Sequence, residues 1–376
     1  MIDTLSASTT TESRFTQFCL KGLQKMYIPS EQVFSASRLL SDGHMLYARD
    51  HTREYRFTMN ALMGLCHAQK QGSSVFLDIE SVYHGMVASR IEEQASSPED
   101  IAATVWTGRC IGTAIPPKTL SLFQDQMENA PQMKRLSAKA LAWSMVACLT
   151  GGEENHHSAL SLAKLAAERF VHKKTALVRE VTVGIRRDWA SFGAHSYMAY
   201  AFLLLARKTK NPWARDIGLR IIRRLVQLQG QNGQWAWMYH VPSGKVADFY
   251  PVFSVHQYAY APFFLLEAIN QGYDEFREPL VRGFRWILGK NELGQSMVEP
   301  SHQIIWRQMI RKWPNTKLIK VLRGMAVIHC GLNAGIKGAD AVQIDRQCWG
   351  FEMALPLCVF SGRNDFSEIL DDIFFQ

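Results

Sequence analysis

The sequence predicts an all-α fold that is arranged as a closed α/α toroid. Apolar residues recur every three or four positions along most of the 376-residue chain, which is the pattern of amphipathic helices. Strand-like segments are few, and no alternation of strands and helices indicates a parallel sheet. About fourteen helices cannot pack around one linear core, and no sharp repeat indicates an open solenoid. A closed double ring of six or seven helical hairpins around a cavity, an (α/α)6-type barrel, satisfies these observations.

Helices are expected along the whole chain. The segment 56–65 has one apolar face and is expected to form an amphipathic helix. The other expected helices lie near 14–27, 75–94, 98–112, 117–128, 134–149, 157–171, 188–207, 213–229, 254–270, 275–288, 302–312, 316–330, 347–361 and 364–374.

One segment has strand character instead. Trp235, Trp237 and Tyr239 alternate within 234–240 and would share one face of a strand. The sequence Val-Pro-Ser-Gly at 241–244 is typical of a turn, and 245–250 would return as a second strand. A small β-hairpin is therefore expected as an insertion in the toroid.

The composition indicates one globular domain. The chain is 47% hydrophobic and 20% charged, and no linker or composition shift divides it, so we expect one domain at 13–376 after a frayed tail at 1–12. No apolar run reaches the ~18 residues of a membrane span, and the start lacks a secretory leader. The seven cysteines are scattered and contain no CxxC pair, which predicts reduced thiols in a cytoplasmic protein.

The net charge of +8 is unevenly distributed. No acidic residue lies between Glu299 and Asp340, whereas the stretch 307–323 carries six basic residues. A solvated pair of helix faces is one interpretation of this stretch. The other is an anionic partner, such as a phosphate, a uronate or a membrane surface that is contacted peripherally. Nucleic acid is not expected, because no nucleic-acid-binding module appears.

Several expected helices begin with polar and aromatic residues and then become apolar. These starts lie at 53–56, 187–192, 254–258, 302–307 and 346–349. In a toroid the ends of the inner helices converge on one mouth, where such groups would form a pocket that favours an anion. Ordinary capping and surface packing is the alternative explanation for each start.

The heptapeptide QGQNGQW at 229–235 matches QxxxGxW, the motif of α/α-toroid isoprenoid cyclases, in which it ties one helix end to the next. The DxDD and DDxxD motifs of cyclase chemistry are absent. Most of the chain also resembles a group of bacterial α/α-toroid proteins associated with polysaccharide biosynthesis and related to six-hairpin glycosidases and sugar epimerases. The matching segments are 54–58, 186–192, 229–237, 250–257 and 305–307.

This resemblance implies carbohydrate chemistry, but two positions depart from it. Relatives carry an acid after the His-Gln pair, where this chain has Tyr258. They also tend to carry a His after an Arg near the C-terminus, where Arg346 is followed by Cys348 and Trp349. The departures predict a more apolar cavity.

Three residues are the candidates for proton transfer. Asp248 lies between aromatic residues, and burial there would raise its pKa; a hairpin residue bonded to its own backbone is the alternative. His256 and Tyr260 are four residues apart on one helix face and would form a relay, unless His256 is a satisfied core residue. Pro262 would kink this helix or delay its start, which would open the turn toward the cavity.

Further residues are candidates for substrate binding, because aromatic faces suit sugar rings and carbocations and Arg binds carboxylate or phosphate at two points. Core packing and ordinary ion pairs are the alternatives. The candidates are Arg56, Arg187, Trp235, Trp237, Tyr239, Tyr250, Gln257, Tyr258, Trp306, Arg307, Arg346 and Trp349. No metal or other cofactor is expected, because the run EENHH at 153–157 would point its side chains in different directions on a helix.

The sequence therefore favours an enzyme that acts on a glycan or uronate by acid–base catalysis, through hydrolysis, elimination or epimerisation. A two-carboxylate hydrolase would need a pair of acids about 5–10 Å apart. Glu54 and Glu352 are the candidate carboxylates besides Asp248, and Asp248 with Glu352 is the pair considered. The alternatives are an isoprenoid or other natural-product cyclase and a non-catalytic glycan-binding protein.

Overall fold

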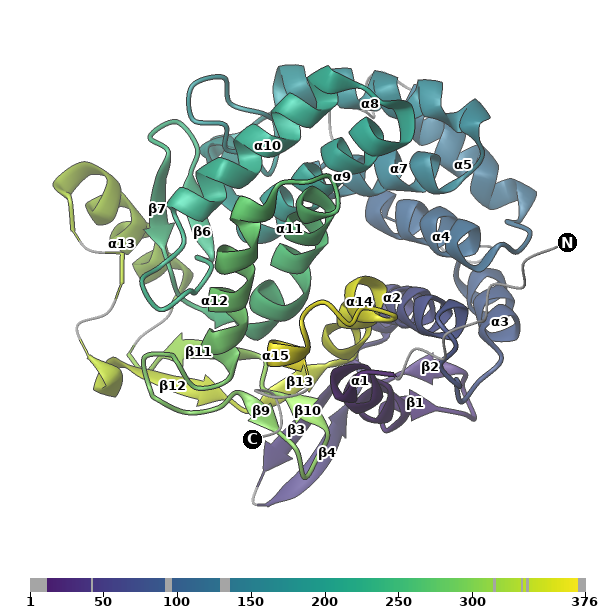
Figure 1. Ribbon diagram of the computed structural model, residues 1–376, viewed down its shortest axis with the longest axis horizontal. Coiled ribbons are helices and arrows are strands. Elements are labelled where there is room, and N and C mark those ends of the chain that lie inside the picture. The colour runs from purple at the N-terminus through teal and green to yellow at the C-terminus, as the bar shows by residue number, and fades with distance from the viewer. Residues whose placement is uncertain are drawn as a thin grey trace, which may run out of the picture.

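A computed structural model of the chain describes residues 12–41, 43–91, 97–128, 136–313, 316–332, 334–335 and 338–370. The predicted tail at 1–12 lies outside these ranges except for its last residue, as does the end of the helix predicted at 364–374. The described residues form the predicted α/α toroid, with small antiparallel sheets at its edge (Figure 1).

Within the described ranges, six helices form the inner ring. They are α2 (His51–Lys70), α4 (Pro98–Ile111), α7 (Ala138–Thr150), α9 (Phe192–Thr209), α11 (Ala261–Ile269) and α14 (Gly350–Phe360). Each helix packs against the next, and α14 packs against α2, which closes the ring. These helices are apolar on almost every side because neighbours cover them all round.

Each inner helix pairs with an outer helix. The outer partners are, in ring order, α3 (Ile79–Ile91), α5 (Pro117–Glu128), α8 (His156–Arg169), α10 (Pro212–Gln227), α12 (Arg277–Ile287) and α1 (Arg14–Gln24). The outer helices are amphipathic: in α10, Ile217, Ile221 and Leu225 are buried, whereas Arg220 is exposed. The last pair joins the two ends of the described chain, because α1 packs against α14.

The QxxxGxW motif connects two of these hairpins. The Gln229 side chain donates hydrogen bonds to the carbonyl oxygens of Gly233 at 2.7 Å and Pro279 at 2.9 Å. It thereby ties the end of α10 to the start of α12. Trp235 is fully buried and stacks on Phe192 with the ring centroids 5.3 Å apart. The structural role that the resemblance implies for this motif is confirmed.

The predicted hairpin is confirmed, although its strands are shorter than expected. Strand β6 (Met238–His240) pairs with β7 (Lys245–Asp248), and β5 (Trp189–Ser191) pairs with the other edge of β6. Gly244 closes the turn with a φ of +72°, a conformation that favours glycine.

The prediction of a helix at 302–312 is wrong. This segment forms β10 (Ile304–Ile305), which pairs with β9 (Val298–Glu299), and β11 (Gln308–Arg311). Strand β11 lies between β8 (Val252–Phe253) and β12 (Val342–Asp345). Both partners of β11 are distant in sequence, so the hydrogen bonds that decide this conformation cannot be seen in the local pattern.

The remaining elements are short. They comprise the strands β1 (Tyr27–Ile28), β2 (Val33–Phe34), β3 (Ser37–Ser41), β4 (His44–Ala48) and β13 (Gln347–Trp349), the 3₁₀ turns Glu153–Asn155, Ile185–Asp188, Asp274–Phe276 and Ala339–Ala341, and the helix α15 (Ser367–Leu370). Helix α13 (Lys317–Cys330) lies outside the ring, at the left of Figure 1, and packs against β7. None of the helices in the described ranges has both the length and the apolar character needed to cross a bilayer.

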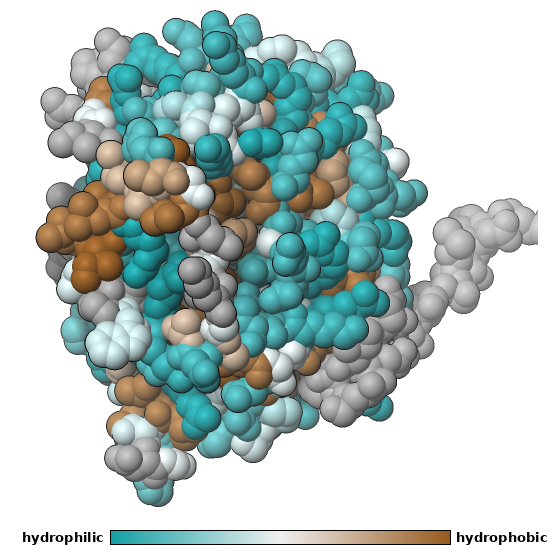
Figure 2. All heavy atoms as spheres, turned by 90° about the vertical axis from the view of Figure 1, so that its left-hand side faces the viewer, coloured by the Kyte–Doolittle hydropathy of each residue, from teal (hydrophilic) through white to brown (hydrophobic). Residues whose placement is uncertain are grey.

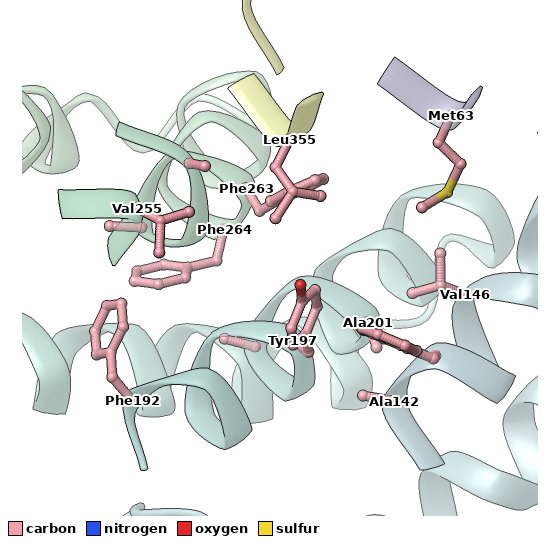
Figure 3. Packing of buried hydrophobic residues seen from close by; sticks show 14 of the residues in the cluster. Met63, Ala142, Val146, Phe192, Tyr197, Ala201, Val255, Phe263, Phe264 and Leu355 are labelled. Carbon is pink, nitrogen blue, oxygen red and sulfur yellow. The ribbon is translucent and has the colours of Figure 1, made fainter. Parts of the chain in front are cut away.

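Side chains fill the middle of the ring. Met63, Val146, Tyr197, Phe263 and Leu355 project toward the axis from five inner helices (Figure 3), and all five are buried. These buried side chains lie between two cavities at opposite ends of the ring. One cavity lies at the N-terminal ends of the inner helices, and a separate cavity of about 350 Å³ lies at their C-terminal ends.

Candidate functional site

The cavity at the N-terminal ends of the inner helices has a volume of about 400 Å³. It is lined by the beginnings of α2, α7 and α14 and by the π-helical turn His256–Tyr260 that precedes α11. The lining residues are Thr52, Arg53, Arg56, Phe57, Asn60, Lys139, Trp143, Tyr260, Trp349 and Phe351. Two of the five predicted helix starts, 53–56 and 346–349, line this pocket, whereas 187–192, 254–258 and 302–307 contribute no lining residue. We call this pocket the axial cavity.

Three cationic side chains line the axial cavity, and none of the residues given above carries a carboxylate. Arg56 is held by Asp100, with Nε 2.8 Å from Oδ1. Arg53 contacts Asp50 at 3.1 Å. Lys139 forms no ion pair with any described residue, and its Nζ lies 5.3 Å from the centroid of the Trp143 ring. Burial, and then the charge of Arg56, lower the pKa of Lys139, although the carboxylates of Glu99, Glu180 and Asp100 oppose the decrease.

Aromatic rings complete the wall. Two guanidinium groups lie against the ring of Trp349, with Arg53 Cζ 4.9 Å and Arg307 Cζ 3.0 Å from its centroid. Phe57 packs beside Trp349 and Phe351, with centroid separations of 5.5 and 4.9 Å. Flat apolar faces next to cations suit a charged sugar ring, which offers both C–H groups and an anion.

A second cavity of about 400 Å³ shares Trp349 with the axial cavity. We call it the side cavity. Its wall includes Trp237, Arg307, Lys320 and Asp345. The carboxylate of Asp345 accepts a hydrogen bond of 2.6 Å from the Gln308 side chain. The side cavity therefore contains the carboxylate that the axial cavity lacks.

Glu352 lies behind the shared wall and lines neither cavity. Its Oε2 accepts a hydrogen bond of 2.9 Å from the backbone N–H of Trp349. Its Oε1 is 3.8 Å from Arg307 Nε and has no hydrogen-bond partner among the described residues. Complete burial raises the pKa of Glu352 to about 7, although Arg307 opposes the rise. A carboxyl group with this pKa can hold or release a proton near neutral pH.

The predicted pair His256 and Tyr260 is brought together. Their rings stack with centroids 5.4 Å apart and an interplanar angle of 25°. Tyr260 lines the axial cavity and hydrogen-bonds with Tyr197, and burial raises its pKa to about 12. His256 is buried among aromatic rings, and that burial lowers its pKa to about 3. His256 is therefore neutral at physiological pH and does not line the cavity.

The π-helical turn explains how Tyr260 reaches the cavity. Pro262 stands within the first two positions of α11, so that helix begins only after the turn. The wider turn at 256–260 presents Tyr260 to the cavity. Such turns occur frequently at functional sites.

Asp248 lies at the end of β7, away from both cavities. Its carboxylate contacts Arg311 at 2.7 Å and Arg323 at 3.4 Å, and it accepts a hydrogen bond from the Tyr250 backbone N–H. This network connects β7 to β11 and α13.

The other predicted residues divide into three groups by their place in the structure. Arg56, Trp237, Arg307 and Trp349 line a cavity. The core residues are Trp235, Tyr239, Tyr250, Gln257, Tyr258 and Trp306. Arg187 and Arg346 are exposed. Trp235, Trp237 and Tyr239 therefore do not form a shared platform, because only Trp237 faces a cavity. The roles assigned to all these residues stay predictions.

Lys139 is one of the cavity residues that were not among the candidates of the sequence analysis. It is the single charged residue of α7, in a helix that is otherwise apolar apart from hydroxyl groups. A lone lysine in such a helix is costly to bury and is a usable signal for a cavity. Asn60, inside the apolar part of α2, is another buried polar residue at the cavity.

Within the described ranges, no group of three or more His, Cys, Asp or Glu side chains is placed to hold a metal ion. The run EENHH occupies the 3₁₀ turn Glu153–Asn155 and the start of α8. No side chain of that 3₁₀ turn is buried.

Comparison with known proteins supports the fold. No protein-family model matches the chain, and no curated protein matches it. Solved structures do match. A possible member of the GH105 family from Salmonella enterica serovar Paratyphi A has a TM-score of 0.56 at 11% identity, over 93% of this chain and 92% of that one. An unsaturated glucuronyl hydrolase from Streptococcus agalactiae has a TM-score of 0.55 at 14% identity, over 92% and 90%.

A third solved structure is an inactive variant of an α-1,6-mannanase from a Salegentibacter species, in complex with α-1,6-mannotriose. It has a TM-score of 0.53 at 11% identity, over 93% of this chain and 98% of that one. At these identities the similarity establishes a shared α/α-toroid architecture over nearly the whole chain.

Proposed function

We propose that the chain is a carbohydrate-active enzyme that binds the acidic sugar of a glycan, a uronate, in the axial cavity. The observation that carries this proposal is the presence of three cations, Arg53, Arg56 and Lys139, in a cavity without a lining carboxylate. Arg53 and Arg56 are paired with carboxylates outside the cavity lining, whereas Lys139 has no ion-pair partner among the described residues. Cations beside aromatic rings favour a ligand that combines an anion with an apolar face. The solved glucuronyl hydrolase and mannanase support the proposal, because both toroids belong to enzymes named for carbohydrates.

We assign the proton transfer to Tyr260. Its phenol lies in the cavity with Arg56 and Lys139, which would neutralise the uronate carboxylate. Neutralising that carboxylate makes the neighbouring C–H group more acidic, so that Tyr260 can serve as base or acid. This position favours elimination or epimerisation at the uronate ring. In this assignment His256 supports the Tyr260 ring, and Asp248 holds the hairpin in place.

Hydrolysis is the second candidate reaction. The pKa of Glu352 near 7 favours it, because a carboxyl group that is protonated at neutral pH can act as a general acid. Asp345, in the side cavity, would be the second carboxylate. This reaction requires Trp349 and Arg307 to move so that Glu352 reaches the substrate.

The test uses uronate-terminated oligosaccharides and neutral oligosaccharides of the same length. We expect calorimetric binding of the acidic ligands only. Lys139→Met should weaken that binding by about tenfold to a hundredfold, because a charge-assisted contact is lost. It should not lower the free energy of unfolding, since burial already disfavours the charged lysine. Lys164→Met, on the exposed face of α8, is the matched control.

Turnover separates the reaction classes. Elimination produces an ultraviolet-absorbing double bond, whereas hydrolysis in heavy-oxygen water adds the label to the product. Tyr260→Phe should keep the affinity and reduce elimination by a factor on the order of 10²–10⁴. Binding without turnover would support the glycan-binding alternative. Equal binding of neutral and acidic ligands would contradict the proposed substrate class.

We also place the enzyme in the cytoplasm, because its seven cysteines are free thiols. Cell fractionation tests this location. A role in polysaccharide biosynthesis stays the expectation from the family resemblance, and deletion of the protein in its host, followed by glycan analysis, would examine it.

A further inference from the structure

Helix α13 carries an apolar face that the other described residues leave exposed. Leu318, Val321, Leu322 and Met325 follow one another at helical spacing, and their exposed fractions are 68%, 58%, 58% and 43%. Trp313, just before the helix, is 78% exposed, and Leu332, just after it, is 59% exposed. Figure 2 looks onto this side of the molecule and shows apolar side chains gathered on it. We call these six residues the α13 face.

The opposite side of α13 is packed, which fixes the orientation of the α13 face. A Cβ atom at Gly324 would lie only 3.0 Å from the ring of Trp189, and Val327 is buried. Arg323 reaches Asp248 under the helix. The helix therefore cannot turn its apolar residues inward without losing these contacts.

The chain segment that carries the α13 face is basic. No acidic residue occurs between Glu299 and Asp340, while Arg311 and Arg323 are matched by Asp248. Lys312 and Lys320 form no ion pair with any residue that the structure describes, and Lys312 is exposed. The surface thus combines exposed Trp and Leu with unmatched positive charge.

These properties identify the partner that fits. A second copy of the chain would bring like charges together across a two-fold interface. An anionic lipid surface instead accepts the apolar side chains below the headgroups, attracts the lysines and suits Trp at the interface. We propose that the α13 face docks on the surface of an anionic membrane.

Docking would also orient the chain. Lys320 belongs to α13 and lines the side cavity together with Trp237 and Asp345. A membrane bound at the α13 face would therefore lie beside that cavity. This inference goes beyond the proposed function, because it concerns where the chain works and holds whatever ligand the axial cavity binds.

The test is co-sedimentation of the full chain with vesicles. We expect binding to vesicles of phosphatidylcholine mixed with phosphatidylglycerol, little binding to phosphatidylcholine alone, and weakening as salt rises. Leu318→Ser and Leu322→Ser should each reduce the partition coefficient by about tenfold, because each removes a buried side chain from the lipid. Lys312→Gln should reduce it by about fivefold.

Leu46→Ser is the matched control, because Leu46 is 50% exposed on β4 and lies outside α13. It should leave binding unchanged. Circular dichroism and turnover of each variant would show that the fold persists. Equal binding to both vesicle types, or an equal loss in Leu46→Ser, would overturn the proposal. So would a concentration-dependent dimer that Leu322→Ser abolishes, since the α13 face would then bind a second copy.

Discussion

At the residue scale, Glu352 shows how burial changes a carboxyl group. An acidic side chain at the start of a helix is ordinarily stabilised in its charged form by the helix dipole. Here complete burial dominates and raises the pKa to about 7, in spite of Arg307 and the Trp349 N–H. The same carboxyl group therefore caps α14 and costs the folded state free energy when it ionises.

The pH dependence of stability follows from this pKa. The carboxyl group ionises near 4.5 in the unfolded chain and near 7 in the folded chain. Between these values the folded state keeps a proton that the unfolded state has released, so the free energy of unfolding falls as pH rises. The total loss is on the order of 3 kcal/mol. We expect Glu352→Gln to remove this pH-dependent fall in the free energy of unfolding. Urea unfolding at several pH values between about 5 and about 8 measures it.

Glu54→Gln is the contrasting variant. Burial would raise the pKa of Glu54, but hydrogen bonds from Arg49 and the Asp50 backbone and the nearby positive charges outweigh it, so the pKa is lowered. Stability from Glu54 is therefore present at neutral pH and lost on acidification, and Glu54→Gln should destabilise the chain near pH 7. An unchanged pH slope in Glu352→Gln would disprove the assignment of a raised pKa.

At the element scale, helices α2 and α14 of the ring approach each other closely. A Cβ atom at Gly64 would collide with the backbone carbonyl oxygen of Ala354. Two helix backbones approach this closely only where one of them lacks a side chain. Gly64 therefore sets the distance between the helices that carry Arg56 and Trp349 to the axial cavity.

We expect Gly64→Ala to lower the free energy of unfolding by about 1–3 kcal/mol, because backbone cannot move aside as a side chain can. Gly85→Ala is the matched control in another helix. A Cβ there meets only the flexible end of Gln32, at 3.2 Å, so the change should be neutral or stabilise α3 by up to about 1 kcal/mol. Thermal unfolding compares Gly64→Ala with Gly85→Ala. Equal melting temperatures would contradict the close approach of α2 and α14.

At the scale of the whole molecule, the N-terminal helix completes the outer layer of the toroid. Phe15 of α1 is fully buried against Phe284, Phe360 and Tyr258, with centroid separations of 5.9, 5.7 and 6.5 Å. These partners come from α12, α14 and the π-helical turn. One side chain from the start of the described chain thus holds together three elements from its second half.

Phe15→Ala should therefore cost about 3–5 kcal/mol, as expected for a large cavity in a core. The loss should appear as a shift of one cooperative urea transition that is recorded identically by fluorescence and circular dichroism. Phe249→Ala, at a half-buried position beside the hairpin, should cost less. A separate early transition in Phe15→Ala would show that the ring opens before the rest unfolds.

The sequence by itself determined most of the helices and the hairpin, because amphipathic periodicity and turn chemistry act over a few neighbouring residues. It also identified Trp349 as part of a helix start at the mouth and Tyr260 as a candidate for proton transfer, and both line the axial cavity. Only the tertiary structure decided that 304–311 forms strands, since the partners of β11 are Val252–Phe253 and Val342–Asp345. Only the tertiary structure placed Lys139 in the cavity and Glu352 behind its wall, because burial and charge at a site are sums over groups from distant parts of the chain.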